Sequence, residues 1–384
     1  MQSHSLRFAA LVAIVTIFGL ATFSRPDFPL AAQATRRAVP WEVFARGLDN
    51  PRGLHFGPDG ALYVAEGGRG GTKLTTRQDC EQVPEPSGPY RGGMTGRISK
   101  IDANGKRTTV IDGLPSTQTA PQSGGSVSGV ADVAFLGDTL YALIAGAGCS
   151  HGNEGTVNAL LRITADGKAT QVADLSSFLK ANPVKNIDPD DFEPDGDFYS
   201  MVAVEGNFYV VEANHGVLEE VTPDGKITRI SDISASQGHV VPTSVAYHDG
   251  NFYVGSLSVF PVHTGSARAY KITPKGEVTE VTVLAPPLSA VLGIAFDQQG
   301  QMYALETSTK DNAFPTPRWG DVVRIKPDST EIEAIATGLT FPTAMTFGPD
   351  GMLYVSNYGF GYGPGRGEIV RMAVPTGKVA GRGR

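Results

Sequence analysis

The feature that most constrains the fold of this chain is a hairpin-like phrase that occurs near both ends. The two copies read NPRGLHFGPDGALYVAE (Asn50–Glu66) and PTAMTFGPDGMLYVSN (Pro342–Asn357). In each copy an apolar run ends at Gly-Pro-Asp-Gly, and a second apolar run with a tyrosine follows. Proline presets φ and Asp-Gly allows a sharp turn, so each copy predicts a β-hairpin. A single hairpin cannot bury its apolar face, and the phrase therefore predicts further copies along the chain.

Four more copies of the second run lie between these two, and all six carry a tyrosine at the same place. The aligned tyrosines are Tyr63, Tyr141, Tyr209, Tyr253, Tyr303 and Tyr354. Each is followed by a loop and a third β-prone run, and the first five copies are also followed by a fourth. Repeated units of four strands are typical of the blades of a β-propeller.

The sixth unit has no fourth run after it, but the beginning of the chain supplies one. The segment Trp41–Leu48 (WEVFARGL) resembles the fourth run of the fifth unit, Glu331–Leu339 (EIEAIATGL). This permutation predicts an all-β, six-bladed β-propeller over residues 40–374, in which an N-terminal strand completes the last blade. Ring closure also leaves no open sheet edge. A β-sandwich with coincidental repeats is the alternative, and the matched tyrosines and the permuted strand disfavour it.

The first 34 residues have the pattern of a secretory signal peptide. Arg7 precedes an apolar run, Phe8–Phe23, and Ala31–Ala34 (AAQA) offers a small-residue cleavage site. We therefore expect a signal peptide over 1–34, a linker over 35–39 and an extracytoplasmic protein, secreted or periplasmic, with no stable membrane span after cleavage. An uncleaved membrane anchor is the alternative, although the apolar run is short for a span.

The charge of the chain narrows the class of partner. The chain carries 32 Lys and Arg against 39 Asp and Glu, a net charge of -7, which argues against nucleic acid or an anionic membrane as a partner. We expect a monomer whose partner is a small molecule or another extracytoplasmic protein. The short, basic, glycine-containing segment 375–384 predicts a flexible tail.

The chain has two cysteines, and both fall in loops after the second strands of neighbouring blades. Cys80 belongs to the first blade and Cys149 to the second, so both loops project from the same face. In an exported protein this placement predicts a disulfide between them. Two unrelated thiols are the alternative.

A propeller places these loops, and the loops between blades, on one face around the channel mouth, where ligands commonly bind. The residues that end the second strands include three carboxylates and an amide, whose oxygens suit a hard cation such as Ca²⁺. The candidate metal ligands are Glu66, Glu212, Glu306 and Asn357. The alternative is that loop backbone caps these side chains, or that they pair with Arg52.

Other polar residues on the same face are candidates for ligand binding. Two of them lie near the start of innermost strands, and the others follow second strands or lie in loops of this face. Loop histidines can supply a general base or metal ligands, although surface loops also carry histidines without a role. The candidate ligand-binding residues are Arg52, Asp132, His151, Asn214, His215, His239 and His263.

An acid-rich stretch, Asp188–Asp197 (DPDDFEPDGD), precedes the third blade. It follows a short helix expected within Asp174–Asn182, with Asp174 as the N-cap. The stretch lacks the spacing of an EF-hand and contains two prolines, so a solvated acidic loop is favoured over a calcium loop.

Four segments of the chain resemble the ScyD/ScyE family. The most specific is Val241–Ile272 (VPTSVAYHDGNFYVGSLSVFPVHTGSARAYKI), and the others are Gly47–Gly71, Ser126–Phe135 and Gly293–Glu306. The resemblance covers most of the mature chain and implies an exported propeller with NHL-like repeats. The chain departs from the family pattern within Asp197–Val221, so the resemblance assigns no site residues there.

Three functions are compatible with these patterns. The favoured one is binding of a small molecule or a protein partner at the channel mouth, with no assigned chemistry. The alternative is a Ca²⁺-dependent hydrolase or lactonase of the gluconolactonase type, in which the cation polarises a carbonyl group; this reading rests on analogy of fold. A quinone-dependent sugar dehydrogenase is less favoured. The cofactor is therefore unknown, with Ca²⁺ as the candidate.

Overall fold

The described part of the chain consists of β-strands joined by turns and short helices. A computed structural model describes residues 38–120, 125–280, 287–325 and 332–375. The expected signal peptide (1–34), most of the linker and nearly all of the tail lie outside these residues. The helices α1 (Leu175–Ala181) and α2 (Ser234–Gln237) are short, and no helix in the described ranges is long and apolar enough to cross a membrane.

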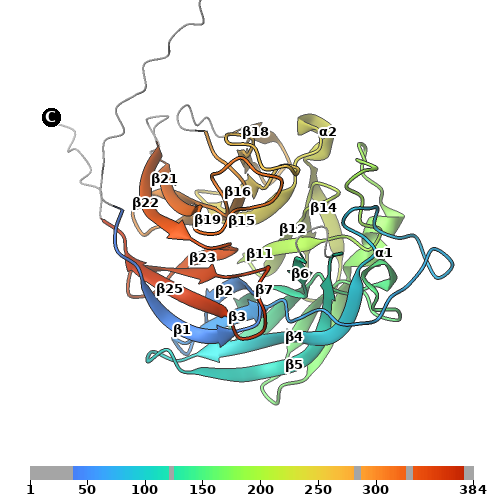
Figure 1. The fold of residues 1–384 in the computed structure, drawn as a ribbon, viewed down its shortest axis with the longest axis horizontal. Helices are drawn as coiled ribbons and strands as arrows, with labels where there is room; N and C mark the ends of the chain where they lie inside the picture. The colour runs from blue at the N-terminus through green and yellow to red at the C-terminus, as the bar shows by residue number, and fades with distance from the viewer. Residues whose placement is uncertain (1–37, 121–124, 281–286, 326–331, 376–384) are drawn as a thin grey trace, which may run out of the picture. The chain divides into compact units, whose positions relative to one another are not determined.

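The strands form six antiparallel sheets, which are the blades of a β-propeller (Figure 1). Blades one to three contain, from the channel outwards, β2 (Pro51–Phe56), β3 (Leu62–Glu66), β4 (Arg91–Ile101), β5 (Arg107–Gln118); β7 (Val130–Leu136), β8 (Thr139–Ile144), β9 (Ala159–Ile163), β10 (Ala169–Asp174); and β11 (Phe198–Val204), β12 (Asn207–Glu212), β13 (Val217–Val221), β14 (Ile227–Asp232).

Blades four to six repeat this order, and the last one takes its outer strand from the start of the chain. They contain β15 (Pro242–His248), β16 (Asn251–Ser256), β17 (Ala269–Ile272), β18 (Val278–Glu280); β19 (Val291–Phe296), β20 (Met302–Glu306), β21 (Gly320–Ile325), β22 (Ile332–Leu339); and β23 (Ala344–Phe347), β24 (Met352–Asn357), β25 (Gly367–Ala373), β1 (Glu42–Leu48).

The predicted closure of the ring is confirmed. Strand β1 pairs antiparallel with β25, from Glu42 opposite Arg371 to Leu48 opposite Gly367, and Figure 1 shows the blue β1 beside the red β25. The Arg371 guanidinium bonds the Glu42 carboxylate at 2.7 Å across this seam. The six-bladed, all-β fold is therefore the one that the permuted repeat predicted.

The Gly-Pro-Asp-Gly turns explain why the hairpin phrase recurs. In the first blade, Gly60 adopts φ 75°, a left-handed conformation that favours glycine. The Asp59 carboxylate accepts hydrogen bonds from the Ala61 N–H at 3.1 Å and the Tyr63 hydroxyl at 3.0 Å. The turn thus fixes both the reversal of the chain and the direction of the repeated tyrosine.

The repeated tyrosines connect successive blades. Each ring meets an aromatic ring of the next blade, and edge-to-face contacts of this kind stabilise beyond their buried area. Edge-to-face pairs are Tyr63–Phe135, Tyr253–Phe296, Tyr303–Phe347 and Tyr354–Phe56, with centroids 4.9, 4.9, 5.1 and 5.0 Å apart. The last pair crosses the closure between the sixth and first blades.

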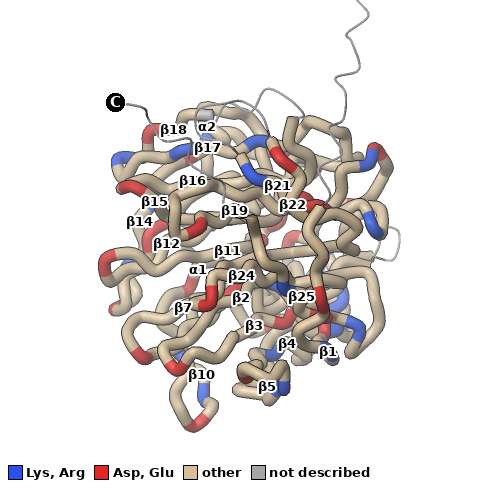
Figure 2. Tube along the Cα trace, turned by 90° about the vertical axis from the view of Figure 1, so that its left-hand side faces the viewer, with Lys and Arg blue, Asp and Glu red and all other residues tan. Residues whose placement is uncertain are grey.

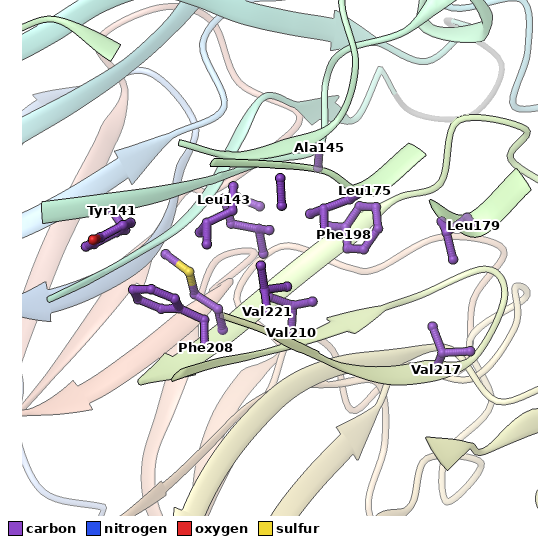
Figure 3. Packing of buried hydrophobic residues seen from close by; sticks show 14 of the residues in the cluster. Tyr141, Leu143, Ala145, Leu175, Leu179, Phe198, Phe208, Val210, Val217 and Val221 are labelled. Atoms are coloured by element: carbon purple, nitrogen blue, oxygen red, sulfur yellow. The ribbon is translucent and has the colours of Figure 1, made fainter. Parts of the chain in front are cut away.

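Apolar side chains fill the spaces between the sheets. Between blades two and three, Tyr141 and Leu143 of β8 pack with Phe208 and Val210 of β12 (Figure 3), and all four are buried. Charged residues lie mainly at turns, and in the view of Figure 2 acidic and basic residues are interspersed there. The apolar faces of neighbouring sheets therefore hold the blades together.

Blade one differs from the predicted four-stranded unit because it carries a fifth strand. The hairpin of β4 and β5 is long, and its end pairs with β6 (Val127–Ser128), with Thr117 opposite Ser128. This extension places the Val127 carbonyl next to Arg52 at the start of the innermost strand, where it accepts a hydrogen bond at 2.6 Å.

Candidate ligand-binding site

Four of the six side chains that end the second strands are bound by the loops between blades. The side-chain oxygen of each accepts a hydrogen bond from a backbone N–H that precedes the innermost strand of the same blade. The pairs are Glu66 with Asp49 (2.6 Å), Glu212 with Asp197 (2.7 Å), Glu306 with Ser289 (2.7 Å) and Asn357 with Thr340 (2.8 Å). All four side chains are buried, and each one therefore fixes its inter-blade loop.

The ring residues that were expected to bind Ca²⁺ have other partners in this structure. Glu66 also accepts from Arg97 at 2.5 Å, and Asn357 donates to Glu368 at 3.0 Å, so the ring residues are engaged within their own blades. Among the residues that the structure describes, no three His, Cys, Asp or Glu side chains come together as a metal site requires. Backbone capping, the alternative, therefore accounts for the strand-end residues that the structure describes, and Ca²⁺ binding by this ring stays a prediction.

The acid-rich stretch is only partly solvated. Asp190 is exposed, whereas Glu193 and Asp195 are 6% and 4% exposed. Buried carboxylates need partners, and loops of neighbouring blades supply them. The favoured expectation of a solvated loop therefore describes the first half of the stretch and not the second. The preceding helix follows the prediction, because Asp174 accepts from the Ser177 N–H at 2.8 Å.

The acidic stretch and the end of β12 hold three of the four candidate loop histidines. His151 Nε2 lies 2.8 Å from Glu193, His239 Nε2 lies 2.8 Å from Asp191, and His215 Nδ1 lies 3.1 Å from Glu212. Asn214 belongs to the same cluster, since its amide donates to the Asp191 carbonyl at 3.0 Å. His263 lies apart from them, exposed in a loop of blade four.

The pair of His151 and Glu193 is the most buried part of this cluster. His151 has no exposed surface, and the Tyr90 ring stacks on it with centroids 5.2 Å apart while the Tyr90 hydroxyl donates to Glu193 at 2.5 Å. Burial alone would lower the pKa of His151, but the Glu193 carboxylate outweighs it and raises the pKa to about 9. At neutral pH the histidine is therefore charged and paired.

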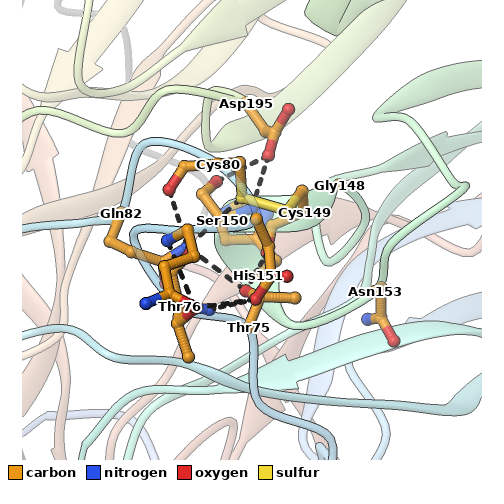
Figure 4. Close-up of a disulfide and its surroundings, with 12 residues drawn as sticks. Thr75, Thr76, Cys80, Gln82, Gly148, Cys149, Ser150, His151, Asn153 and Asp195 are labelled. Atoms are coloured by element: carbon orange, nitrogen blue, oxygen red, sulfur yellow. Dashed lines mark hydrogen bonds between the residues drawn. A yellow bond between two sulfur atoms is a disulfide. The ribbon is translucent and has the colours of Figure 1, made fainter.

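The predicted disulfide is confirmed and lies beside this cluster (Figure 4). Cys80 and Cys149 are bonded, with Cα atoms 6.3 Å apart. Ser150 follows Cys149 in the short 3-10 turn Cys149–His151, and its N–H and hydroxyl donate to Asp195 at 2.8 and 2.6 Å. The disulfide thus links a loop of blade one to the turn Cys149–His151, which donates hydrogen bonds to the acidic stretch.

A cavity of about 260 Å³ opens between the disulfide, helix α1 and the acidic stretch. Its apolar lining residues are Leu179, Pro183, Ile187, Phe192 and Pro194, and its other lining residues are Cys80, Glu81, Lys180, Asp195 and His215. The Lys180 ammonium bonds Asp195 at 2.5 Å. An apolar cavity with a few polar groups is typical of a small-molecule site.

His215 is the polar lining group that the fold orients most tightly. Glu212 accepts from its backbone N–H at 2.7 Å and lies 3.1 Å from Nδ1, which leaves Nε2 without a hydrogen bond to any described residue. Burial opposes ionisation of both groups, but their mutual attraction outweighs it, raising the pKa of His215 and lowering that of Glu212. A protonated imidazole can donate from Nε2 to a ligand in the cavity.

A second polar group of the loop face lies at the channel mouth. Arg52 donates to the Val127 carbonyl at 2.6 Å and to the Tyr199 hydroxyl at 3.0 Å. Asp197, at the end of the acidic stretch, lines the same small depression. Its carboxylate makes no hydrogen bond to a described residue, and burial raises its pKa to about 8.

Asp132 belongs to the wall of the channel below this mouth. Its carboxylate accepts from the N–H groups of Val133 and Met201 at 2.8 and 2.9 Å, and burial raises its pKa to about 7. A Cβ at Gly53 would lie 1.9 Å from the Asp132 carboxylate, so only glycine fits there. The channel itself, about 390 Å³, is lined by the innermost strands, including His55.

Sequence reasoning missed several of these residues. Asp197 and Tyr199 stand inside the acidic stretch and the next strand, and nothing in their local pattern distinguishes them from surface residues. Glu193 and Tyr90 become partners only through the fold, because 103 residues separate them. The one available signal was the density of acids before blade three.

The sheets and the site together define the class of protein: this chain is a six-bladed β-propeller with a polar, cavity-bearing loop face. No family model and no curated protein sequence matches the chain. The solved structures that resemble it include propellers of the regucalcin and gluconolactonase kind.

Three of these structures show how similar the resembling proteins are to this chain. A protein of unknown function from Bacteroides thetaiotaomicron is 13% identical, over 88% of this chain and 72% of that chain, with a TM-score of 0.53. Regucalcin from Agrobacterium tumefaciens, described as a calcium-binding protein, is 14% identical over 88% and 94%, with a TM-score of 0.51. A gluconolactonase from Xanthomonas campestris is 13% identical over 88% and 99%, with a TM-score of 0.45. At these identities the first two likenesses show the fold alone.

Proposed function

We propose that this protein is an extracytoplasmic β-propeller that binds a small, largely apolar molecule with an oxygen acceptor in the cavity beside the disulfide. The observation that carries the proposal is the orientation of His215. Glu212 holds its Nδ1, its Nε2 makes no hydrogen bond to a described residue, and the ring lines a cavity of about 260 Å³.

The lining of the cavity sets the chemistry of the ligand. Leu179, Ile187 and Phe192 offer apolar surface, and burial of a ligand against them contributes roughly 25 cal/mol per Å². A protonated His215 adds a charge-assisted hydrogen bond, which contributes about 1.5–3 kcal/mol when the acceptor is well placed. A carbonyl or ether oxygen on a compact ring system matches both features.

The disulfide supports the extracytoplasmic part of the proposal, because such bonds persist in oxidising compartments. The resemblance to the ScyD/ScyE family supports an exported protein as well, and membership in that family stays a prediction. A protein partner at the loop face, a monomeric state and a quinone-dependent dehydrogenase activity also stay predictions.

A panel of small cyclic carbonyl compounds, comprising lactones, esters and amides, tests the binding function by saturation-transfer NMR and calorimetry. We expect binding to the wild type, and about tenfold or greater weakening in His215→Phe, which keeps the ring and removes Nε2. Ile187→Glu at the cavity should also weaken binding. The matched controls His263→Phe and Val259→Glu change similar exposed residues in blade four and should bind as the wild type does.

Equal binding by His215→Phe and the wild type would contradict the proposal. So would a panel in which no member binds the wild type at millimolar concentration while Ile187→Glu leaves the protein folded.

Hydrolysis of an ester or lactone in the same cavity is the second candidate function. The observation that favours it is the carboxylate–imidazole pair, since Glu212 orients His215 as a carboxylate orients a general base. Neutral His215 Nε2 would take a proton from water, the hydroxide would attack the carbonyl carbon, and the proton would pass to the leaving alkoxide. No step is assigned to a metal.

Lactone hydrolysis measured by pH-stat separates this candidate from binding alone. The raised pKa of His215 predicts that the rate increases as pH rises through that pKa, because only the neutral imidazole accepts a proton. Activity should survive a chelator and disappear in His215→Phe. Binding without hydrolysis leaves the first proposal standing and removes the second.

A further inference from the structure

Arg52 is a buried cation for which the described residues provide no ion pair. Its side chain belongs to a residue that is 7% exposed, and its hydrogen bonds go to the Val127 carbonyl, the Ser128 hydroxyl and the Tyr199 hydroxyl. A buried charge without a counter-ion is costly, so the mouth of the channel is preorganised for an anion.

The groups that accept hydrogen bonds from Arg52 are neutral, and the Asp197 carboxyl lines the same depression without a hydrogen bond to a described residue. The Tyr199 oxygen accepts from Arg52 at 3.0 Å, which leaves the hydroxyl proton for another acceptor, and the guanidinium lies 5.2 Å from the centre of the Tyr199 ring. The depression that Arg52, Ser128, Asp197 and Tyr199 line together measures about 10 Å³. That is room for about one water-sized group, and a flat carboxylate oxygen suits it better than a tetrahedral phosphate.

We propose that the mouth of the central channel binds the carboxylate of a small organic acid, with the Arg52 guanidinium and the Tyr199 hydroxyl as donors and the body of the acid outside the mouth. Guanidinium and carboxylate groups match in geometry, and hydrogen bonds between them are about twice as strong as neutral ones. The carboxylate would supply the ion pair that no described residue makes with Arg52.

Asp197 makes this site sensitive to pH. Burial, the Glu193 carboxylate and the Glu212 carboxylate raise its pKa to about 8, against the opposing effects of Arg52 and His151. Tyr90 and Tyr199 also face this group. Below pH 8 the neutral Asp197 carboxyl can donate to the bound anion, and above it the ionised carboxylate repels the anion.

This site is distinct from the cavity of His215. Asp195 and Asp197 belong to the same acidic stretch but line different spaces, with Asp195 in the cavity and Asp197 at the mouth. Glu212 contacts both regions, because it accepts from the Asp197 N–H and pairs with His215, so the control for the mouth comes from blade four.

Acetate titration of the whole protein tests the proposal, with acetamide as the neutral probe of the same shape and ionic strength held constant. Acetate should raise the melting temperature and bind by calorimetry, whereas acetamide should do neither. Arg52→Gln should weaken acetate binding at least tenfold, and Tyr199→Phe should weaken it several-fold by removing one charge-assisted donor. His263→Phe, which changes an exposed histidine of blade four, is the control and should bind acetate as the wild type does.

The pH dependence provides a readout that does not need Arg52→Gln to fold. Acetate binding to the wild type should fall as pH rises through about 8, whereas Asp197→Asn should bind with little change over that range. Equal effects of acetate and acetamide would overturn the proposal. It would also be overturned by acetate binding that is unchanged in both Tyr199→Phe and Arg52→Gln, or by tighter binding of inorganic phosphate than of acetate.

Discussion

Glu212 and Glu306 occupy the same position in two blades, and their surroundings give them opposite protonation states. Both end a second strand and cap an inter-blade loop. Glu212 faces His215, which outweighs burial and lowers its pKa. Glu306 has no histidine beside it, and burial raises its pKa to about 8. At neutral pH the first is a carboxylate in an ion pair and the second a neutral acid.

Substitution by glutamine should distinguish these two residues. At pH 7, Glu306→Gln replaces a neutral acid and should change the free energy of unfolding by less than about 0.5 kcal/mol. Glu212→Gln breaks the buried ion pair with His215, whose pKa then falls because Glu212 no longer opposes the effect of burial, and should cost about 3 kcal/mol. The stability from Glu212 is present above its unfolded pKa and is lost as pH falls through its folded pKa. Urea unfolding followed by circular dichroism measures both, and equal costs at pH 7 would contradict this account.

His151 should make the stability of the protein depend on pH in the alkaline range. Its folded pKa of about 9 exceeds the unfolded value of about 6.5. The stabilisation is therefore complete below pH 6.5 and is lost as pH rises through about 9. His151→Phe should lose this dependence and cost about 3–5 kcal/mol at pH 6, whereas the exposed control His263→Phe should cost less than about 0.5 kcal/mol. Urea unfolding between pH 6 and 9.5 measures the slope, and a flat wild-type profile would speak against a charged pair.

At the scale of elements, the disulfide and the acidic stretch act as one structural unit. The bond closes a sequence separation of 69 residues, and restriction of the unfolded chain predicts up to about 4 kcal/mol of stabilisation. The double substitution Cys80→Ser and Cys149→Ser should lower the midpoint of urea unfolding and weaken ligand binding in the adjacent cavity. Dithiothreitol should have the same effect on the wild type and none on the double variant. An unchanged midpoint would show that the loops of Cys80 and Cys149 keep their stability without the disulfide.

The elements that could be predicted from the sequence are those that local chemistry specifies. The turns at Asp59 and Asp350, the repeated tyrosines and the similarity of Trp41–Leu48 to the outer strand of blade five each identify a strand without reference to the rest of the fold. Strand β6 was not predictable, because it forms only where the long β4–β5 hairpin reaches it. The burial of Glu193 also depends on partners distant in the chain, so its acidic stretch looked like a surface loop.

The candidate site was predictable in part for the same reason. The ring symmetry placed Glu66, Glu212 and Glu306 correctly at the loop face, but symmetry does not say whether such side chains meet each other or turn to their own loops. In the structure these side chains turn to their own loops, because the backbone N–H groups of the inter-blade loops bind them. Three candidate histidines fall in one cluster because blades two to four are neighbours, whereas His263 lies apart.

At the scale of the whole molecule, closure by β1 holds the ring together. Ala45 and Leu48 are buried in the core shared with Leu54, Tyr354 and the first blade. A chain that begins at Asp49 would expose this core and leave β25 with an unpaired edge, which favours aggregation. We expect such a chain to lose cooperative thermal unfolding and to aggregate at concentrations where the full protein does not. Calorimetry and light scattering check this, and a cooperative transition in the shortened chain would contradict the closure.

The most direct test of the functional account is NMR of the protein with ¹⁵N-labelled histidine, titrated with the tightest binder of the cyclic carbonyl panel. The account predicts that the Nε2 resonance of His215, assigned by its loss in His215→Phe, shifts on binding. The Nδ1 resonance should keep the shift of a nitrogen hydrogen-bonded to Glu212, and those of His55 and His263 should not move. A ligand that binds without moving the Nε2 resonance of His215, or that moves the resonance of His55 in the channel instead, would contradict it.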